Sequence, residues 1–150
     1  MTRNQTLDMK RRTAINCLKK SGVKPSLQRI AILDYLLSHA THPAVDEIYE
    51  TLVKDIPTLS RTTVYNTLHL FAENGLATQM ALDEQRVRFD GNVSPHAHFN
   101  CRCCQKIFDL PLPSGIPMEG EALSEDLKVE QVEVNYRGIC AECQKKQEFN

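Results

Sequence analysis

Cysteine and histidine are the residues of this 150-residue chain with the greatest capacity for chemistry, with six and five copies respectively. Four of the cysteines form two pairs, Cys101-x-x-Cys104 and Cys140-x-x-Cys143. Two intervening residues let both sulfurs of a pair reach one ion, and two pairs complete the tetrahedral sulfur shell that Zn²⁺ prefers. The sequence therefore predicts a structural zinc site.

The two remaining cysteines, Cys17 and Cys103, receive no role from the sequence. Cys103 leaves a second pairing open, Cys101-x-Cys103, but Cys104 repeats the spacing of the second pair and is the preferred ligand. The 35 residues between the pairs exceed the length of a compact zinc ribbon, so regular elements are expected between them. A disulfide framework is disfavoured because the cytosol keeps thiols reduced.

A second group of candidate ligands begins with His96-x-His98. Residues two apart on a strand point to the same face, so both imidazoles reach one ion. Asp109, on an expected returning strand, adds a carboxylate. Taken singly, His42, Asp90 and Asp109 are more typical of a helix cap or a surface position than of a metal ligand. Nitrogen and oxygen ligands of this kind suit Fe²⁺, Mn²⁺ or Zn²⁺.

Hydrophobic periodicity predicts the elements that position these side chains. Ser26 and Ser60 are suitable helix N-caps, and Gly75 suits a helix end. The expected helices span residues 26–38, 43–53 and 60–74. Leu27, Ile30, Leu33, Leu36 and Leu37 are the expected core positions of the first of these helices.

A β-hairpin is expected after these helices, with extended runs at 76–82 and 86–90 and a turn at 83–85. Three helices followed by a hairpin form a winged helix-turn-helix, whose third helix enters the major groove of DNA. The polar face of that helix carries groups suited to bases and phosphates, although such a face is also typical of the solvated side of any amphipathic helix. Its residues are Arg61, Thr62, Thr63, Tyr65 and Asn66.

The charge distribution also favours DNA binding. The net charge is −1, yet residues 1–30 hold eight of the 18 Lys and Arg residues and only one acidic residue. A basic leading segment suits contact with phosphates. The alternative is a solvated, frayed N-terminus.

The predicted fold class is α+β, with a winged helix-turn-helix domain at 1–90, a hinge linker at 91–95 and a small α/β dimerisation domain at 96–150. In the last of these, strands at 96–101 and 106–110 flank the first cysteine pair. A loop at 111–119, a short helix at 121–126 and a strand at 128–136 with a bulge near 130–131 follow. The last strand is suited to pairing across a dimer.

Composition and the N-terminal residues restrict the location of the protein. No run approaches the roughly 18 apolar residues that a membrane span requires. The first twenty residues are polar and basic and contain no secretory signal. We therefore expect a cytoplasmic protein with no membrane partner.

In combination, these motifs resemble the ferric uptake regulator family of bacterial metal-dependent repressors over residues 22–145. The segments that carry the resemblance are Gln28-Arg29, His42-Pro43, Asp46-Glu47-Ile48-Tyr49, Ser60-Arg61-Thr62-Thr63-Val64-Tyr65-Asn66-Thr67-Leu68, Glu73-Asn74-Gly75-Leu76, Arg88-Phe89-Asp90, His96-Ala97-His98-Phe99-Asn100-Cys101, Lys106-Ile107-Phe108-Asp109 and Gly138-Ile139-Cys140-Ala141-Glu142-Cys143.

The resemblance implies a homodimer that represses transcription by binding a palindromic operator in double-stranded DNA. It also implies a structural Zn²⁺ in the four-cysteine site and a regulatory Fe²⁺ or Mn²⁺ at the domain junction. By motif, the regulatory ligands are His42, Asp90, His96, His98 and Asp109.

Asp109 makes the chain similar to the peroxide-responsive subgroup, because iron-responsive members usually carry Glu there. In that subgroup, peroxide reacts with bound Fe²⁺ and oxidises a ligand histidine, and the matching positions are His42 and His96. Peroxide is then a signal, and no small-molecule substrate is expected. An iron-responsive repressor without peroxide sensing is the alternative.

Two other protein classes are alternatives. A hydrolytic metalloenzyme would also use His and Asp ligands, but it keeps an open ligand position beside a general base. Five protein ligands leave little room for this, so we expect no enzyme. A zinc-ribbon interaction module, with the helical half as a partner-binding surface, is the other alternative, and failure to bind DNA in the presence of any metal would favour it.

Overall fold

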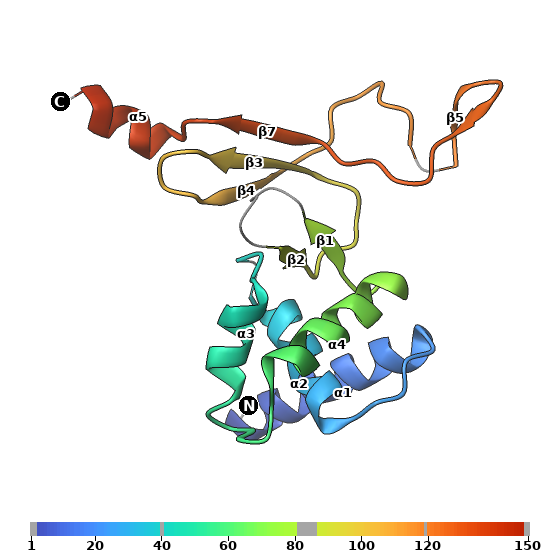
Figure 1. The fold of residues 1–150 in the computed structure, drawn as a ribbon, viewed down its shortest axis with the longest axis vertical. Coiled ribbons are helices and arrows are strands. Elements are labelled where there is room, and N and C mark those ends of the chain that lie inside the picture. The colour runs from blue at the N-terminus through green and yellow to red at the C-terminus, as the bar shows by residue number, and fades with distance from the viewer. Residues whose placement is uncertain (1–2, 40, 81–86, 119, 149–150) are drawn as a thin grey trace. The chain divides into compact units, whose positions relative to one another are not determined.

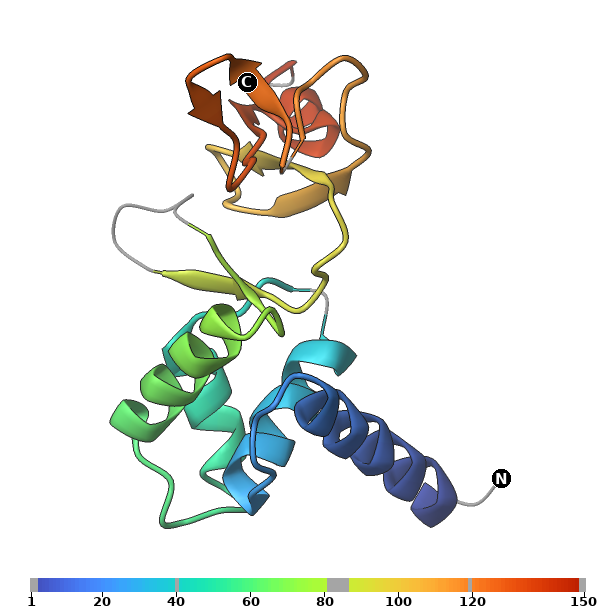
Figure 2. The same ribbon diagram turned by 90° about the vertical axis from the view of Figure 1, so that its right-hand side faces the viewer.

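The computed structural model describes residues 3–39, 41–80, 87–118 and 120–148. The chain divides into two compact units, Met1–Val93 and Ser94–Asn150. Helices dominate the first unit and strands the second, as Figures 1 and 2 show. The fold class is α+β, as predicted.

The first unit contains α1 (Arg3–Lys20), α2 (Leu27–Ser38), α3 (Val45–Leu52) and α4 (Arg61–Glu73). Side-chain caps begin two of these helices. Ser26 Oγ accepts a hydrogen bond from the Arg29 N–H at α2, and Ser60 Oγ accepts one from the Thr63 N–H at α4. Both predicted N-caps are therefore confirmed, and each satisfies a backbone donor that the first helical turn leaves unpaired.

The sequence predicted no helix before residue 26, and it allowed either a phosphate-binding segment or a frayed terminus where α1 lies. Ala14 and Leu18 are fully buried and belong to the same core cluster as Phe71 of α4. Cys17 and Leu18 follow Ala14 by three and four residues in an otherwise polar segment, and this spacing could have predicted the helix. Frayed backbone is therefore wrong for residues 3–20.

The buried stripe of α2 differs from the expected one. Ile32, Leu33 and Leu36 are buried, whereas Leu27 and Leu37 are exposed by 69% and 46%. Leu27 occupies the first position of the helix, ahead of the turns that pack on the core. The expected core positions at Leu27 and Leu37 are therefore wrong.

Two short strands follow α4. Strand β1 (Thr78–Met80) pairs antiparallel with β2 (Arg88–Asp90). The loop before α3 lies along the other edge of β2, because Ala44 bridges Arg88 and the Phe89 N–H donates to the Pro43 carbonyl at 3.0 Å. Helices followed by this antiparallel pair form the predicted winged helix-turn-helix. The predicted turn at 83–85 lies outside the described residues.

The second unit is organised around a three-stranded sheet in the order β4-β3-β7. Strand β3 (Ala97–Cys101) pairs antiparallel with β4 (Ile107–Leu110) and parallel with β7 (Asn135–Gly138). Helix α5 (Ala141–Glu148), which the sequence analysis did not predict, follows β7. The two strands expected beside the first cysteine pair are confirmed.

Two predictions for this unit are wrong. The segment expected to form a short helix contains β5 (Ala122–Ser124), which pairs with β6 (Leu127–Lys128). The hydrogen bonds from the Gly120 N–H to the Val129 carbonyl and from the Val129 N–H to the Glu121 carbonyl extend this hairpin, and six residues are too few for a stable isolated helix.

The strand expected over 128–136 is not continuous. Residues 129–134 form no regular strand, and β7 begins only at Asn135. The pairing irregularity lies between Ala122 and Ser124 on β5 rather than near 130–131. Of the alternating residues Val132, Val134 and Tyr136, only Tyr136 lies in a strand, and the other two precede β7.

None of the helices in the described ranges combines the length and the apolar character that crossing a bilayer requires.

Candidate metal centres and nucleic-acid interface

The four paired cysteines converge in the second unit. Cys101 ends β3, Cys104 lies in the following turn, and Cys140 and Cys143 stand at the start of α5. Their four sulfur atoms all lie within 4.8 Å of one another. The turn is closed by Gln105, which has a φ of 64° and donates its N–H to the Cys101 carbonyl at 2.9 Å.

This cluster fits a zinc ion. Sulfurs about 2.3 Å from a central Zn²⁺ form a tetrahedron with edges of about 3.8 Å. The Cys104 and Cys140 sulfurs are 3.8 Å apart. Backbone N–H groups supply further support, since the Cys140 N–H lies 3.4 Å from the Cys101 sulfur.

The thiols differ in their readiness to ionise. Hydrogen bonds from the backbone N–H groups of Cys104 and Cys140 lower the pKa of Cys101 to about 6. The hydrogen bond with the Cys140 side chain and burial raise the pKa of Cys143 to about 12. Zn²⁺ binds thiolates, so the backbone hydrogen bonds that lower the pKa of Cys101 favour metal binding, whereas the raised pKa of Cys143 opposes it until the ion displaces the proton.

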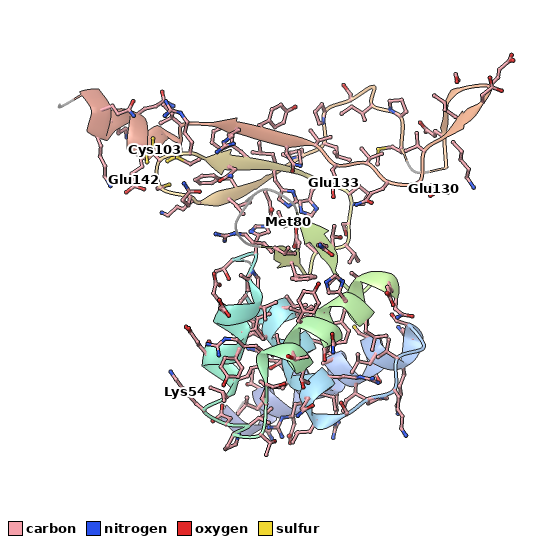
Figure 3. All side chains as sticks on the ribbon, viewed as in Figure 1. Lys54, Met80, Cys103, Glu130, Glu133 and Glu142 are labelled. Atoms are coloured by element: carbon pink, nitrogen blue, oxygen red, sulfur yellow. The ribbon has the colours of Figure 1, made fainter. Side chains whose placement is uncertain are left out.

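The surplus cysteines lie outside this cluster. Cys103 is exposed, and the Gln147 side chain of α5 donates to its sulfur at 3.7 Å. Figure 3 labels it beside Glu142, next to the gathered yellow sulfur atoms. Cys17 is half-buried and packs against the core of the first unit. The arrangement favours Cys104 over Cys103 as the partner of Cys101.

The second unit also gathers three of the predicted regulatory ligands. His98 of β3 stands directly opposite Asp109 of β4. The Nε2 atoms of His98 and His96 lie 3.4 and 3.6 Å from Asp109 Oδ1. The predicted arrangement of two imidazoles on one face with a carboxylate from the neighbouring strand is therefore present.

Backbone contacts orient this triad. The His96 Nδ1 atom lies 2.6 Å from the Ser94 carbonyl, so its proton is placed on Nδ1 and Nε2 is left to accept. The two imidazole rings cross almost perpendicularly, with centroids 4.4 Å apart. Both histidines are largely shielded from solvent, whereas the Asp109 side chain is 39% exposed.

The first unit holds the other two predicted ligands as a buried pair. His42 Nε2 lies 3.6 Å from Asp90 Oδ2, and the two side chains are only 3% and 8% exposed. The pairing of the loop before α3 with β2 sets this geometry. His42 has a φ of 54°, which is uncommon for a residue with a Cβ and costs conformational energy.

The polar face of α4 has the exposure expected of a recognition helix. Arg61, Thr62, Tyr65 and Asn66 are exposed, and Tyr65 retains 47% of its accessible surface. Thr63 differs, because its N–H and hydroxyl both engage Ser60 and the residue is half-buried. Thr63 therefore stabilises the N-cap of α4.

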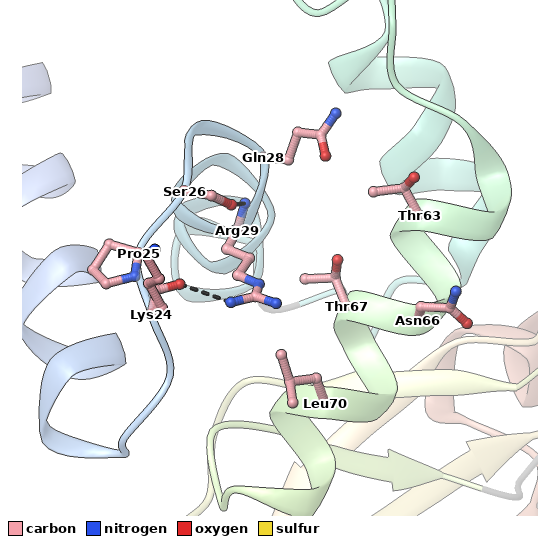
Figure 4. Close-up of a pocket in the computed structure, with 9 residues that line it drawn as sticks. All are labelled: Lys24, Pro25, Ser26, Gln28, Arg29, Thr63, Asn66, Thr67 and Leu70. Carbon is pink, nitrogen blue, oxygen red and sulfur yellow. Dashed lines mark hydrogen bonds between the residues drawn. The ribbon is translucent and has the colours of Figure 1, made fainter.

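A pocket of about 490 Å³ lies between this helix and the start of α2 (Figure 4). Arg29 donates to the Lys24 carbonyl at 2.9 Å on one side, while Thr63, Asn66 and Thr67 face it from α4. Five polar residues that line this pocket are absent from the DNA contacts expected from the sequence: Lys24, Ser26, Gln28, Arg29 and Thr67. Lys24 and Arg29, the basic residues that flank the Ser26 cap, are the sequence feature that could have indicated this pocket.

Comparisons with known proteins agree on one family. The model of the "Ferric uptake regulator family" matches residues 20–137. The "Peroxide-responsive repressor PerR" of Staphylococcus aureus (strain USA300) is 38% identical over 134 residues, which cover 89% of this chain and 90% of that protein.

Two solved structures share the fold. The ferric uptake regulator Fur of Helicobacter pylori, described as having three functional metal-binding sites, aligns with a TM-score of 0.67 at 22% identity and covers 96% of this chain and 97% of its own. The ferric uptake regulator from Pseudomonas aeruginosa with manganese aligns with a TM-score of 0.65 at 20% identity, covering 85% and 98%.

Proposed function

Because the chain belongs to the ferric uptake regulator family, we propose that it is a metal-dependent transcriptional repressor that senses peroxide through oxidation of a ligand histidine. The observation that carries the proposal is the set of oriented nitrogen and oxygen donors in each unit. Metals of this donor preference include Fe²⁺ and Mn²⁺.

One divalent ion bound by both units would supply the regulatory step. His42 and Asp90 belong to the first unit, and the three remaining ligands, His96, His98 and Asp109, belong to the second. An ion that needs all five favours the arrangement in which the two donor sets face each other. The shared ion therefore fixes the orientation of the helix that binds DNA.

Metal binding and DNA binding are coupled in this scheme, and the coupling is reciprocal by thermodynamic necessity. A typical coupling of about 1–3 kcal/mol changes each affinity by roughly 5- to 150-fold. The positive φ of His42 fits a role in metal binding. A histidine rarely adopts this backbone conformation by itself, so the surrounding structure must hold it there.

The DNA would meet α4 and the pocket beside it. Arg61, Thr62, Tyr65 and Asn66 face the major groove, and Thr63 holds the helix cap from behind. Lys24 and Arg29 then lie at the edge of this surface, where cations and backbone donors contact phosphate. The basic α1 adds positive charge to the same unit.

The partner that completes the repressor is a second copy of the chain, and the target is a palindromic operator. The second unit leaves apolar side chains exposed that a dimer would cover: Phe108, Leu110, Leu127 and Tyr136. Two copies related by a two-fold axis place two α4 helices on successive half-sites.

Peroxide would break the regulatory site through its histidines. In the balanced reaction, one oxygen atom of hydrogen peroxide is added to the imidazole of His42 or His96, and the other leaves as water. The histidine loses two electrons and peroxide gains them. Bound Fe²⁺ supplies the redox chemistry, while Mn²⁺ occupies the same ligands without it.

The test is peptide mass mapping of zinc-containing protein loaded with Fe²⁺ and exposed briefly to peroxide, with Mn²⁺-loaded protein as control. We expect the peptides that hold His42 or His96 to become heavier by one oxygen atom, only with iron and together with loss of DNA binding. Fragmentation of the peptide that holds both His39 and His42 gives an internal control: the added oxygen should lie on His42 and not on His39, an exposed residue outside both donor sets.

Unmodified histidines in protein that nevertheless releases DNA when iron is removed would contradict peroxide sensing. That outcome would leave an iron-responsive repressor. DNA binding that ignores every metal would contradict the wider proposal.

A further inference from the structure

Arg61 has an environment unlike that of the other residues on the α4 face. It is the first residue of α4, just after the Ser60 cap. Residues at this end of a recognition helix reach base edges in helix-turn-helix proteins. Thr62 and Tyr65 are exposed on the same part of the helix.

Two side chains of α3 hold the Arg61 guanidinium. Its Nε donates to Asp46 Oδ1 at 3.0 Å, and its Cζ lies 4.2 Å from the centre of the Tyr49 ring. Asp46 and Tyr49 are three residues apart, so they share one face of α3. Asp46 also lies in the first turn of that helix, where the helix dipole favours a negative charge.

These contacts orient the side chain while leaving it exposed. The Arg61 side chain keeps 57% of its accessible surface despite its two partners. A guanidinium has donors on more than one edge, so an Nε bond to Asp46 leaves the terminal nitrogens as a second pair. Holding the long side chain in one orientation reduces the entropy that it loses when it binds.

Building on the proposed function, we propose that Arg61 is the residue that selects guanine in each operator half-site, with Asp46 as its positioning residue. The terminal nitrogens of Arg61 donate to O6 and N7 of guanine, the two acceptors that this base presents in the major groove. Adenine offers N7 with an amino donor, which a guanidinium cannot pair with in the same way.

The negative charge of Asp46 also makes a base a better partner for Arg61 than a phosphate. A phosphate beside this guanidinium would stand close to a carboxylate of the same sign, and the repulsion would reduce the benefit of the contact. A neutral guanine carries no such cost. The pocket with Lys24 and Arg29 has no described carboxylate among its lining residues, so phosphate is better received there.

The experiment is selection from a randomised double-stranded DNA pool with the full-length, zinc-containing protein loaded with Mn²⁺. Wild-type protein should enrich sites that contain one guanine at a fixed place in each half-site. Arg61→Ala should lose that preference by roughly 5- to 150-fold and keep the preferences at other positions. Arg61→Lys should lose most of it, because lysine lacks the planar fork.

Asp46→Asn tests the positioning role, with Glu50→Gln as its matched control. Both remove one carboxylate charge from an exposed position of α3, one turn apart, but Asp46 contacts Arg61. We expect Asp46→Asn to weaken the guanine preference and Glu50→Gln to leave it at the wild-type level. Zinc content and circular dichroism verify that each variant is folded.

Three results would overturn the inference. They are a wild-type site without a fixed guanine, a uniform loss of affinity in Arg61→Ala with a shallower salt dependence, and an unchanged guanine preference in Asp46→Asn. The second result would identify a phosphate contact. Absence of any enriched DNA in wild-type protein would instead refute the proposed function.

Discussion

The positions of single sulfur atoms distinguish the four proposed zinc ligands from the neighbouring Cys103. Cys103 and Cys104 are adjacent in sequence and both exposed, yet only the Cys104 sulfur joins the cluster with Cys101, Cys140 and Cys143. The spacing of the second pair predicted this choice, and the turn closed at Gln105 produces it. These adjacent cysteines therefore allow a matched comparison of a proposed ligand with a residue outside the cluster.

Cys104→Ser should remove tightly held zinc, whereas Cys103→Ser should retain one zinc ion per chain. A tetrahedral site that loses a thiolate loses most of its affinity, and the second unit depends on the ion because its apolar core is small. Metal analysis after dialysis against a chelator measures the first effect, and thermal unfolding measures the second. Equal zinc retention in the two variants would contradict the assignment of Cys104.

At the scale of elements, α1 contributes to the core as well as to the charge of the first unit. Leu18 is fully buried in the cluster that contains Leu68 and Phe71, while Leu7 of the same helix is 48% exposed. The position of the basic residues of α1 therefore depends on the packing of its buried apolar residues against the core. This packing is testable by comparing the two leucines.

Leu18→Ala should lower the free energy of unfolding by about 2–5 kcal/mol, the usual cost of truncating a buried leucine. Leu7→Ala should change it by less than about 0.5 kcal/mol, as surface substitutions usually do. Urea unfolding of the zinc-containing protein gives both values. Similar effects at the two positions would show that α1 does not pack as described.

Gly91, the residue that follows β2, lies close to the backbone of α2. A Cβ on Gly91 would lie 2.9 Å from the backbone oxygen of Leu36, whereas one on Gly75 would meet nothing within 4 Å. Gly91→Ala should therefore destabilise the first unit by about 1–3 kcal/mol, because the backbone of α2 must shift.

Gly75→Asn is the comparison for Gly91→Ala. Gly75 has a φ of 74°, and asparagine tolerates this region better than other residues with a Cβ. We expect a smaller loss of stability, measured by the same urea unfolding. A larger loss at Gly75 would contradict the described approach of Gly91 to α2.

The sequence predicted best those elements whose signals are local. The caps at Ser26 and Ser60 and the strands beside Cys101 are examples, because each depends on a few neighbouring residues. The short helix expected at 121–126 was wrong because pairing with β6 outweighed a weak local preference. Helix α1 was missed because its apolar residues are few and its burial depends on partners far along the chain.

The same distinction applies to the candidate sites. The two-residue spacing within each cysteine pair predicted that the four sulfurs gather in one cluster. The alternation of side chains along a strand predicted that His96 and His98 share a face. The contact of His42 with Asp90 depends on a bridge between residues 44 and 88, which no local pattern encodes. The Arg61 contact with Asp46 joins two helices and was likewise not visible in the sequence.

At the scale of the whole molecule, the proposal depends on one regulatory ion that takes ligands from both units. Each unit supplies only part of the proposed donor set, with two donors from the first and three from the second. Removing a ligand from either unit should therefore have the same consequence. This equivalence distinguishes a shared ion from two independent sites.

The most direct measurement is DNA affinity as a function of Mn²⁺ concentration, for wild-type protein, His42→Ala, His98→Ala and the double variant, with His39→Ala as control. We predict that Mn²⁺ strengthens binding by wild-type protein and His39→Ala, that either ligand variant loses this response, and that the double variant is no worse than the single ones. A retained metal response in one single variant, or losses that add in the double variant, would contradict a shared ion.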